Sequence, residues 1–311
     1  MHAYIAGING MLGRALRSEF QANGYEVSGA KSSEVDFTNF EETCTELNNL
    51  KPDVLIIAAA KVGGIGANLN SPVDYLSDNI LIQTNLLNAA HVANVRKVVF
   101  IASSCIYPKN VPQPIVEESL MTGLLEESNA PYSMAKLAGI KLVQAYRSQY
   151  KKDWIAVLPT NLYGPHDNFN LEESHVLPSL MRKFQLATEQ GKDKVEIWGD
   201  GTPTREFLHI SDAATAIRIA SENYNEALPL NIGAKTEHTI REVAEMLIQC
   251  TGFSGKLVFD TSRPNGAMRK QLDSTRIRSL GWEPKIDLST GLKETYEWLT
   301  NSLTKGEEVK I

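Results

Sequence analysis

The chain has 311 residues, 42% of them hydrophobic and 22% charged, which is enough apolar material for one large domain or two closely joined ones. Its formal net charge is −6 and like charges do not cluster, which argues against a nucleic-acid partner or an anionic membrane surface. No stretch approaches the roughly 20 apolar residues of a membrane span, and Cys44, Cys105 and Cys250 lack C-x-x-C spacing. We therefore expect a cytoplasmic protein with a small-molecule partner, no disulfide framework and no metal site.

Short apolar runs alternate with longer amphipathic ones along the first half of the chain. In chain order they are "HAYIAG", "MLGRALRSEFQANG", "YEVSGA", "FEETCTELNNL", "DVLIIAAA", "DNILIQTNLLNAAHVANV" and "KVVFIASS". Strands that are apolar throughout, separated by helices, are typical of a parallel sheet covered on both faces. The pattern predicts an α/β protein with a doubly wound parallel sheet, the Rossmann arrangement.

The alternation becomes less regular after "WIAVLPTNLYG". We predict a nucleotide-binding Rossmann domain over residues 1–166, with returning segments near 205–233. Residues 167–311 are then expected to form a second, smaller α/β lobe that binds the substrate.

The first predicted turn, "GINGMLG", contains three glycines at positions 7, 10 and 13. Residues without Cβ allow backbone amides and the positive end of a helix to approach a pyrophosphate. The end of the second strand, "GAKSSEVD", lacks the usual acidic residue that holds a ribose 2′-hydroxyl, which favours NADP over NAD. The candidate cofactor residues from these two turns are Gly7, Asn9, Gly10, Met11, Leu12, Gly13, Lys31, Ser32 and Ser33, with Asp36 either at the adenine or capping a turn.

Tyr132 and Lys136 stand four residues apart in "APYSMAKLAG", at the start of a predicted helix. This spacing places both side chains on one helix face, where an ammonium is expected to lower the pKa of a phenol. Ser103, at the end of a predicted strand, completes a set for binding and protonating a carbonyl oxygen.

With these residues the chain resembles the extended short-chain dehydrogenases/reductases. Six further stretches are similar to the GDP-L-fucose synthases of that superfamily: "AAAKVGGI", "SSCIYPK", "NLYGPHDNF", "SHVLP", "WGDGTPTREFLH" and "LGW". The resemblance implies an NADPH-dependent enzyme that epimerises GDP-4-keto-6-deoxy-D-mannose at C3 and C5 and then reduces C4. It also implies a homodimer built on the helix of Tyr132 and residues 80–94, where Leu137, Ile140 and Val143 suit either an interface or packing on the sheet.

The resemblance also implies residue roles. Cys105 and His175 would be the base and acid of epimerisation, and Ser103, Tyr132 and Lys136 would carry out the reduction. Further cofactor contacts would be Ala58, Lys136, Asn161 and His175, and the substrate would contact Ser103, Ser104, Cys105, Asn161, Lys183, Trp198, Arg205 and Arg269.

Several alternatives stay open. The same chemistry could act on another GDP-4-keto sugar, either a heptose or a dideoxy sugar. A third hypothesis is a non-catalytic sensor that binds NADP. A 4,6-dehydratase would need carboxylates where this chain has Ser104 and Cys105. Trp198 suits the core or a ligand equally, and "KVGGIG" is expected to let the sugar or cofactor approach closely.

Overall fold

The apolar runs of the first half form neighbouring strands of one parallel sheet. The computed structural model describes residues 1–263, 265 and 267–311. Within this part, six strands lie in the order β10-β5-β4-β3-β1-β2, and all neighbours are parallel. They are β1 (His2–Ala6), β2 (Glu26–Ser28), β3 (Val54–Ile57), β4 (Lys97–Ile101), β5 (Asp153–Pro159) and β10 (Leu230–Ile232). The predicted doubly wound α/β sheet is confirmed.

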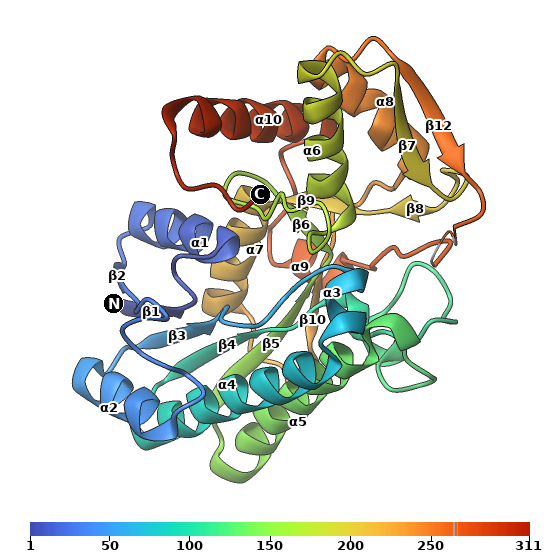
Figure 1. Cartoon of the computed structure of the whole chain (residues 1–311). Helices are drawn as coiled ribbons and strands as arrows, with labels where there is room; N and C mark the ends of the chain where they lie inside the picture. Colours follow the sequence, from blue (N-terminus) through green and yellow to red (C-terminus); the bar gives the residue numbers. More distant parts are fainter. Residues whose placement is uncertain (264, 266) are drawn as a thin grey trace.

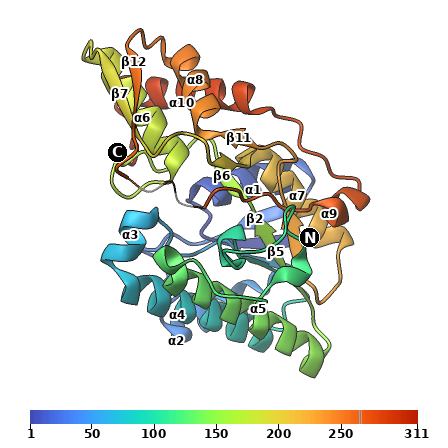
Figure 2. The same ribbon diagram turned by 90° about the vertical axis from the view of Figure 1, so that its right-hand side faces the viewer.

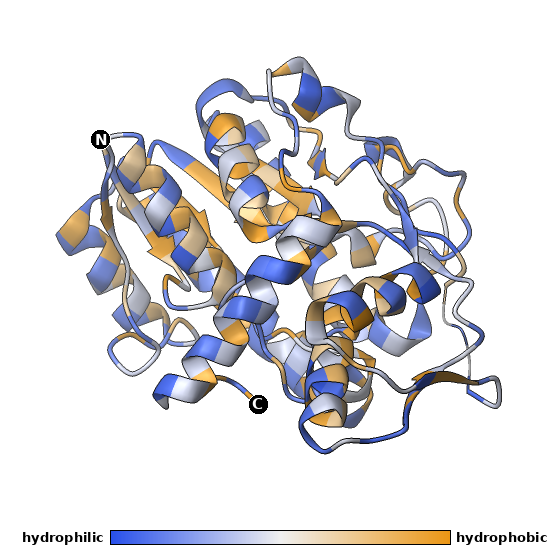
Figure 3. Cartoon of the chain, turned by 90° about the horizontal axis from the view of Figure 1, so that it is seen from above, coloured by the Kyte–Doolittle hydropathy of each residue, from blue (hydrophilic) through white to orange (hydrophobic). Residues whose placement is uncertain are grey.

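Helices cover both faces of this sheet, as Figure 1 shows. One face carries α1 (Met11–Ala22) and α7 (Ile210–Asn223), and the other carries α2 (Phe40–Leu50), α4 (Pro72–Val92) and α5 (Ala130–Tyr150). Every residue of β3 and β4 is buried, because helices cover both faces of the sheet at these central strands. In Figure 3 the strands are accordingly the most continuously hydrophobic part of the chain.

The sheet has a topological switch point at β1. From β1 the chain passes to β2 on one side and then returns to β3 on the other side. The connections therefore diverge at the carboxyl ends of β1 and β3, which leaves the crevice in which doubly wound sheets bind ligands.

The later part of the chain forms a second lobe with its own apolar core, above the sheet in Figure 1. Its helices are α6 (Val176–Glu189), α8 (Ile240–Thr251) and α10 (Leu288–Lys305). Its strands pair as β7 (Lys194–Trp198) with β12 (Lys256–Asp260) and as β8 (Thr204–Arg205) with β11 (His238–Thr239). A further parallel pair, β6 (Asn161–Tyr163) and β9 (Phe207–His209), lies where the two lobes meet.

Short elements complete the connections. They are α3 (Ile65–Asn70), α9 (Thr275–Ser279) and the 3-10 turns η1 (Ser104–Ile106), η2 (Glu117–Ser119) and η3 (Glu127–Asn129). Among the helices described, none is long and apolar enough to cross a membrane.

Candidate active site

The first glycine turn is shaped by close backbone contacts at the end of β1. Gly7 has φ +90° and its carbonyl accepts a hydrogen bond from the Gly10 N–H at 3.0 Å. A Cβ on Gly7 would lie 2.8 Å from the Ala59 nitrogen, and a Cβ on Gly13 would lie 2.0 Å from the Gly7 oxygen. A Cβ on Gly10 would come no closer than 3.4 Å to its nearest neighbour, the Gly7 oxygen. Gly7 and Gly13 are therefore required by the turn itself, whereas Gly10 leaves space for a ligand.

The N-terminus of α1 opens onto this turn. Gly10 is its extended N-cap and makes no side-chain cap, and the first turn of this fully described helix holds no acidic residue. The amides of Met11, Leu12 and Gly13 begin the helix, where the dipole favours an anion. Ala58 lies beside the turn because its N–H donates to Ala6 at the end of β1.

Lys31, Ser32 and Ser33 are exposed on the turn after β2, and Asn9 is exposed on the first glycine turn. The Lys31 N–H donates to the Glu34 carboxylate at 2.9 Å. The contacts of Asp36 favour the capping alternative, because its Oδ1 accepts from the Thr38 N–H at 2.9 Å and from the Thr38 hydroxyl at 2.7 Å. These hydrogen bonds lower the pKa of Asp36.

Hydroxyl groups hold Cys105 from two sides, just beyond β4. The Cys105 N–H donates to Ser103 Oγ at 3.2 Å, and the Ser133 hydroxyl donates to the Cys105 carbonyl at 3.3 Å. Ser133 lies on α5 next to Tyr132, so this contact ties the turn η1 to the helix that carries the tyrosine. The buried Ser104 completes the turn.

Burial raises the pKa of Tyr132, the proximity of Cys105 raises it further, and a hydrogen bond with Ser103 acts in the opposite direction. The expectation that Lys136 lowers this pKa is wrong. The Lys136 ammonium donates to the Ile101 carbonyl at 2.9 Å and lies 5.9 Å from the Tyr132 ring centroid. Burial lowers the pKa of Lys136 itself to about 7. The phenol therefore keeps its proton at neutral pH and can act as an acid.

Arg205 brings the second lobe to this turn. Burial lowers the pKa of its guanidinium, and the nearby Cys105 opposes that shift. Its Nη1 donates to the Thr204 carbonyl at 2.7 Å. Asn161 lies on the same side, held by donation from its Nδ2 to the Glu206 carbonyl at 2.9 Å.

His175 immediately precedes α6. The residue is exposed, and desolvation by the surrounding protein lowers the pKa of its imidazole. The imidazole makes no hydrogen bond to any residue that the structure describes. A position opposite Cys105 therefore stays a prediction.

Trp198 lies at the end of β7 between two cations and is 60% exposed, which removes the core alternative. The Lys183 Nζ is 5.7 Å and the Arg263 Cζ is 5.1 Å from its ring centroid. Arg263 is a candidate that the sequence analysis missed, because nothing in its local pattern separates it from an exposed loop arginine.

Arg269 is already engaged by a carboxylate. Its Nε and Nη2 donate to Glu237 at 2.9 and 2.6 Å, and Glu237 also accepts from the Thr204 hydroxyl at 2.9 Å. Arg269 is therefore linked to Arg205 through Glu237 and Thr204, and a substrate phosphate would compete with Glu237 for the guanidinium.

Other histidine, cysteine and glycine residues make contacts within the protein itself. His166 has φ +68° and packs on Trp298 with ring centroids 4.5 Å apart, a loop-structuring contact. Cys44 and Cys250 are half-buried on α2 and α8. Among the described residues, no group of three or more His, Cys, Asp and Glu side chains is arranged to hold a metal ion. In the "KVGGIG" loop, a Cβ on Gly63 would meet Tyr75 and a Cβ on Gly64 would meet Ser174, and the approach of the sugar or cofactor to this loop stays a prediction.

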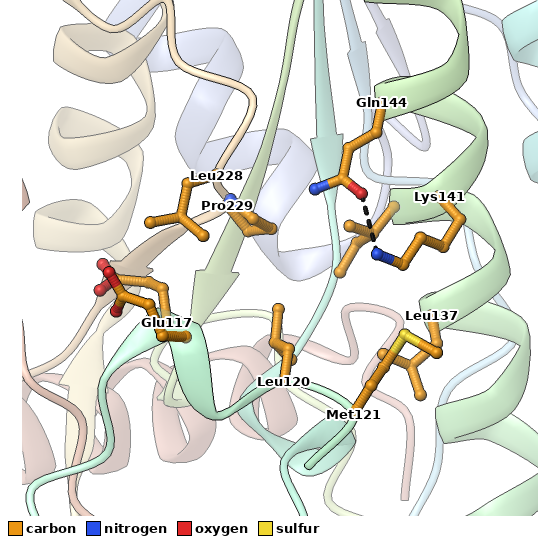
Figure 4. A pocket seen from close by; sticks show the side chains of 10 residues that line it. Glu117, Leu120, Met121, Leu137, Lys141, Gln144, Leu228 and Pro229 are labelled. Atoms are coloured by element: carbon orange, nitrogen blue, oxygen red, sulfur yellow. Dashed lines mark hydrogen bonds between the residues drawn. The ribbon is translucent and has the colours of Figure 1, made fainter.

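Figure 4 shows a pocket between α5, the turn of residues 117–121 and the segment of residues 228–229 that precedes β10. It has a volume of about 140 Å³ and lies between Leu120, Leu137, Gln144 and Leu228. Ligand sites for molecules of drug size usually occupy 300 Å³ or more, roughly, so this pocket is too small for a nucleotide sugar. None of the candidate active-site residues lines it.

The strand order, the glycine turn and the Ser, Tyr and Lys set define a dinucleotide-dependent enzyme of the short-chain type. The family described as "NAD dependent epimerase/dehydratase family" matches residues 3–233, and the chain belongs to this family.

Particular relatives narrow this class. The chain is 46% identical to GDP-L-fucose synthase 1 of Arabidopsis thaliana over 296 residues, which cover 95% of this chain and 92% of that protein. A solved GDP-L-fucose synthetase of Naegleria fowleri bound to NADP has a TM-score of 0.91 and 28% identity, covering 100% of this chain and 95% of that one. A GDP-6-OMe-4-keto-L-xylo-heptose reductase from C. jejuni also has a TM-score of 0.91, with 33% identity and coverages of 97% and 98%.

Proposed function

We propose that the chain catalyses the GDP-L-fucose synthase reaction, in which GDP-4-keto-6-deoxy-D-mannose is epimerised at C3 and C5 and its C4 ketone is then reduced with NADPH. One observation supports an epimerisation step in addition to reduction. A thiol stands on the turn after β4 beside the Ser103–Tyr132 pair, with Arg205 of the second lobe close to it. A reductase alone has no use for Cys105 there, whereas an epimerase needs a base next to the ketone.

The residues of the first turn fit NADP. Gly10 leaves room for a pyrophosphate at the uncapped α1 N-terminus, and Lys31, Ser32 and Ser33 can bind a 2′-phosphate. When bound, NADPH supplies the hydride that C4 receives. We assign the nucleotide to residues 1–166 with the segments near 205–233, and the GDP-sugar to the lobe of residues 167–311.

The ketone acidifies the hydrogens on C3 and C5, so inversion needs a base on one face of the sugar and an acid on the other. We assign Cys105 as the base and His175 as the acid. Because desolvation lowers the pKa of His175, its protonated form is a strong enough acid to return a proton to carbon.

Reduction uses the neighbouring hydroxyls. Tyr132 retains its proton at neutral pH and donates it to the C4 oxygen, while Ser103, which hydrogen-bonds Tyr132, helps bind that oxygen. Lys136 reaches from α5 to the Ile101 carbonyl at the end of β4, with its Nζ 5.9 Å from the Tyr132 ring centroid, and we assign it to the ribose.

The GDP group requires cationic and aromatic contacts. We assign it to Lys183, Trp198, Arg205 and Arg269, and we add Arg263 because it shares the Trp198 ring with Lys183. Lys183 offers a single ammonium where a guanidinium would bind two phosphate oxygens at once.

We also propose a cytoplasmic homodimer. Leu137, Ile140 and Val143 of α5 are buried against the sheet and cannot form an interface, so α4 and α5 must offer other residues. Ile80, Leu81 and Met134 on the same two helices remain exposed and apolar, and they support the assembly instead.

The test is incubation with GDP-4-keto-6-deoxy-D-mannose and NADPH in D₂O, with the product analysed by NMR. Deuterium at both C3 and C5 together with reduction at C4 is expected. Reduction without exchange would remove the epimerase half. The heptose reductase similarity makes the GDP-4-keto heptose the comparison substrate, and a higher kcat/KM with it would reassign the sugar.

A second arm separates the two steps. Tyr132→Phe removes the proton donor but leaves Cys105 and His175. The variant should therefore still exchange deuterium, while the rate of C4 reduction should fall by a factor of about 100 or more. Reduction at the wild-type rate would show that another group donates the proton.

A further inference from the structure

A bridge segment, residues 61–70, connects β3 to α4 and contacts both parts of the candidate active site. Its helix α3 packs against η3, which leads directly into α5 and Tyr132. At its other side, the Gly64 N–H donates to the Glu173 carbonyl at 2.7 Å, two residues before His175. Figure 2 shows α3 on the edge of the lower lobe that faces the second lobe.

Gly64 is a glycine because of space and not because of its backbone angles. Its φ of −66° and ψ of −178° are accessible to any L-residue. A Cβ at this position would lie 2.4 Å from the Ser174 carbonyl oxygen, 3.2 Å from its carbonyl carbon and 3.3 Å from the Glu173 oxygen. Any side chain at Gly64 must therefore move the backbone next to His175.

Two buried amides hold the bridge segment in place, Asn79 from helix α4 of its own lobe and Asn68 from within the segment. Asn79, which is 2% exposed on α4, accepts from the Lys61 N–H at 2.9 Å and donates to the Lys61 carbonyl at 3.0 Å. Asn68 donates to the carbonyls of Gly63 and Gly64 at 3.1 and 3.0 Å. Since Asn79 fixes the start of the loop to α4 and Asn68 fixes its glycine turn from within, the contact of this loop with residues 173–174 constrains where that backbone lies.

His175 depends on that backbone. The His175 carbonyl accepts from the Ser179 N–H at 3.1 Å, and this hydrogen bond begins α6. The imidazole of His175 has no hydrogen-bond partner within the described part of the chain. We infer that Gly64 is a positioning residue for the acid of epimerisation: it seats the 173–175 backbone so that His175 faces the sugar. This inference rests on the proposed function, and it concerns epimerisation only.

The experiment compares the two half-reactions in Gly64→Ala. Deuterium exchange into the keto sugar should fall about 100-fold, the scale of a 1 Å misplacement. Oxidation of GDP-L-fucose by NADP⁺ in a single turnover involves no inversion of C3 or C5, and it uses Tyr132 and Ser103, so it should change by about twofold or less. Gly66→Ala is the matched control, because its Cβ would meet only the Glu172 carbonyl at 3.3 Å, further from His175.

A double-mutant cycle tests whether Gly64 acts through His175. His175→Ala added to Gly64→Ala should slow exchange little further, since the acid is already displaced. Asn68→Ala loosens the same loop without adding bulk, and it should reproduce the selective loss of exchange if Gly64→Ala fails to fold.

Three results would overturn the inference: exchange in Gly64→Ala at the wild-type rate, equal loss of exchange and hydride transfer in a folded variant, or fully additive effects with His175→Ala. A wild-type protein that oxidises GDP-L-fucose but exchanges no deuterium would instead overturn the epimerase function, and the inference with it.

Discussion

Cys105 shows how single residues of this site are oriented. The Cys105 N–H donates to the Ser103 hydroxyl and the Ser133 hydroxyl donates to the Cys105 carbonyl, so hydroxyl groups from the start of η1 and from α5 fix both peptide units around Cys105. The direction of the Cα–Cβ bond follows from that backbone, which holds the thiol beside Tyr132 and Arg205.

Cys105→Ser should therefore slow deuterium exchange at C3 and C5 by about 100-fold to 10,000-fold, the usual contribution of an acid or base. The backbone contacts survive this change, so single-turnover oxidation of GDP-L-fucose by NADP⁺ should be retained. Cys44→Ser on α2 is the control, because its thiol accepts from Asn48 on the same helix and packs against the sheet core, with none of the candidate site residues among these contacts. Equal loss of both half-reactions in Cys105→Ser would contradict the division of roles.

Lys136 is a second residue whose environment makes a prediction, this time about stability. Burial lowers its pKa from 10.5 to about 7 in the folded chain. Below about pH 7 both states are protonated and the folded state bears the full cost of a buried charge. Between about 7 and 10.5 the unfolded chain binds more protons, so this residue's contribution to the free energy of unfolding becomes more favourable as pH rises.

Relative to Lys136→Met, the wild-type protein should therefore gain stability between pH 6.5 and pH 9, by an amount on the order of a few kcal/mol at most. Urea unfolding of both proteins at the two pH values measures the change. Lys141→Met, at an exposed position on the same helix, should show no comparable trend. A difference between wild type and Lys136→Met that stays constant with pH would contradict a buried ammonium.

At the scale of elements, the strand-turn-helix unit of β1 and α1 is built on backbone contact. Gly13 lies in the first turn of α1, where a Cβ would come within 2.0 Å of the Gly7 oxygen and 2.7 Å of Ile8. The helix can start this close to β1 only because Gly13 has no side chain.

Gly13→Ala should push α1 away from the turn and weaken NADPH binding by about tenfold or more, with a loss of about 1–3 kcal/mol in the free energy of unfolding from overpacking. Fluorescence titration with NADPH and urea unfolding measure the two effects. Arg17→Ala, at an exposed position of the same helix, should leave both unchanged. Wild-type affinity in Gly13→Ala would separate the turn from the cofactor.

At the scale of the whole molecule, the candidate site is assembled from both lobes. Cys105 and Tyr132 come from the sheet domain, whereas Arg205, Lys183 and Trp198 come from the second lobe. The outer surface of α4 and α5, on the far side of the sheet from that lobe, is left for the proposed dimer contact.

If that surface joins two copies, Leu81→Lys should convert the dimer to a monomer in sedimentation velocity, because it places a charge in an apolar contact. Leu124→Lys tests a position that is 78% exposed outside the two helices, and it should keep the wild-type sedimentation coefficient. A wild-type protein that sediments as a monomer at micromolar concentration would contradict the assembly.

The sequence by itself determined the sheet and the glycine turn and predicted the Ser103, Tyr132 and Lys136 set, because periodicity and residue spacing report local geometry. The role of Cys105 followed only from the family resemblance. Local spacing could not reveal the raised pKa of Tyr132, since that pKa depends on burial and on the proximity of Cys105. Nor could it reveal the engagement of Arg269 by Glu237, the place of Arg263 at Trp198, or the contact of Gly64 with Ser174. Those contacts join residues far apart along the chain, and only the packing of the two lobes brings them together.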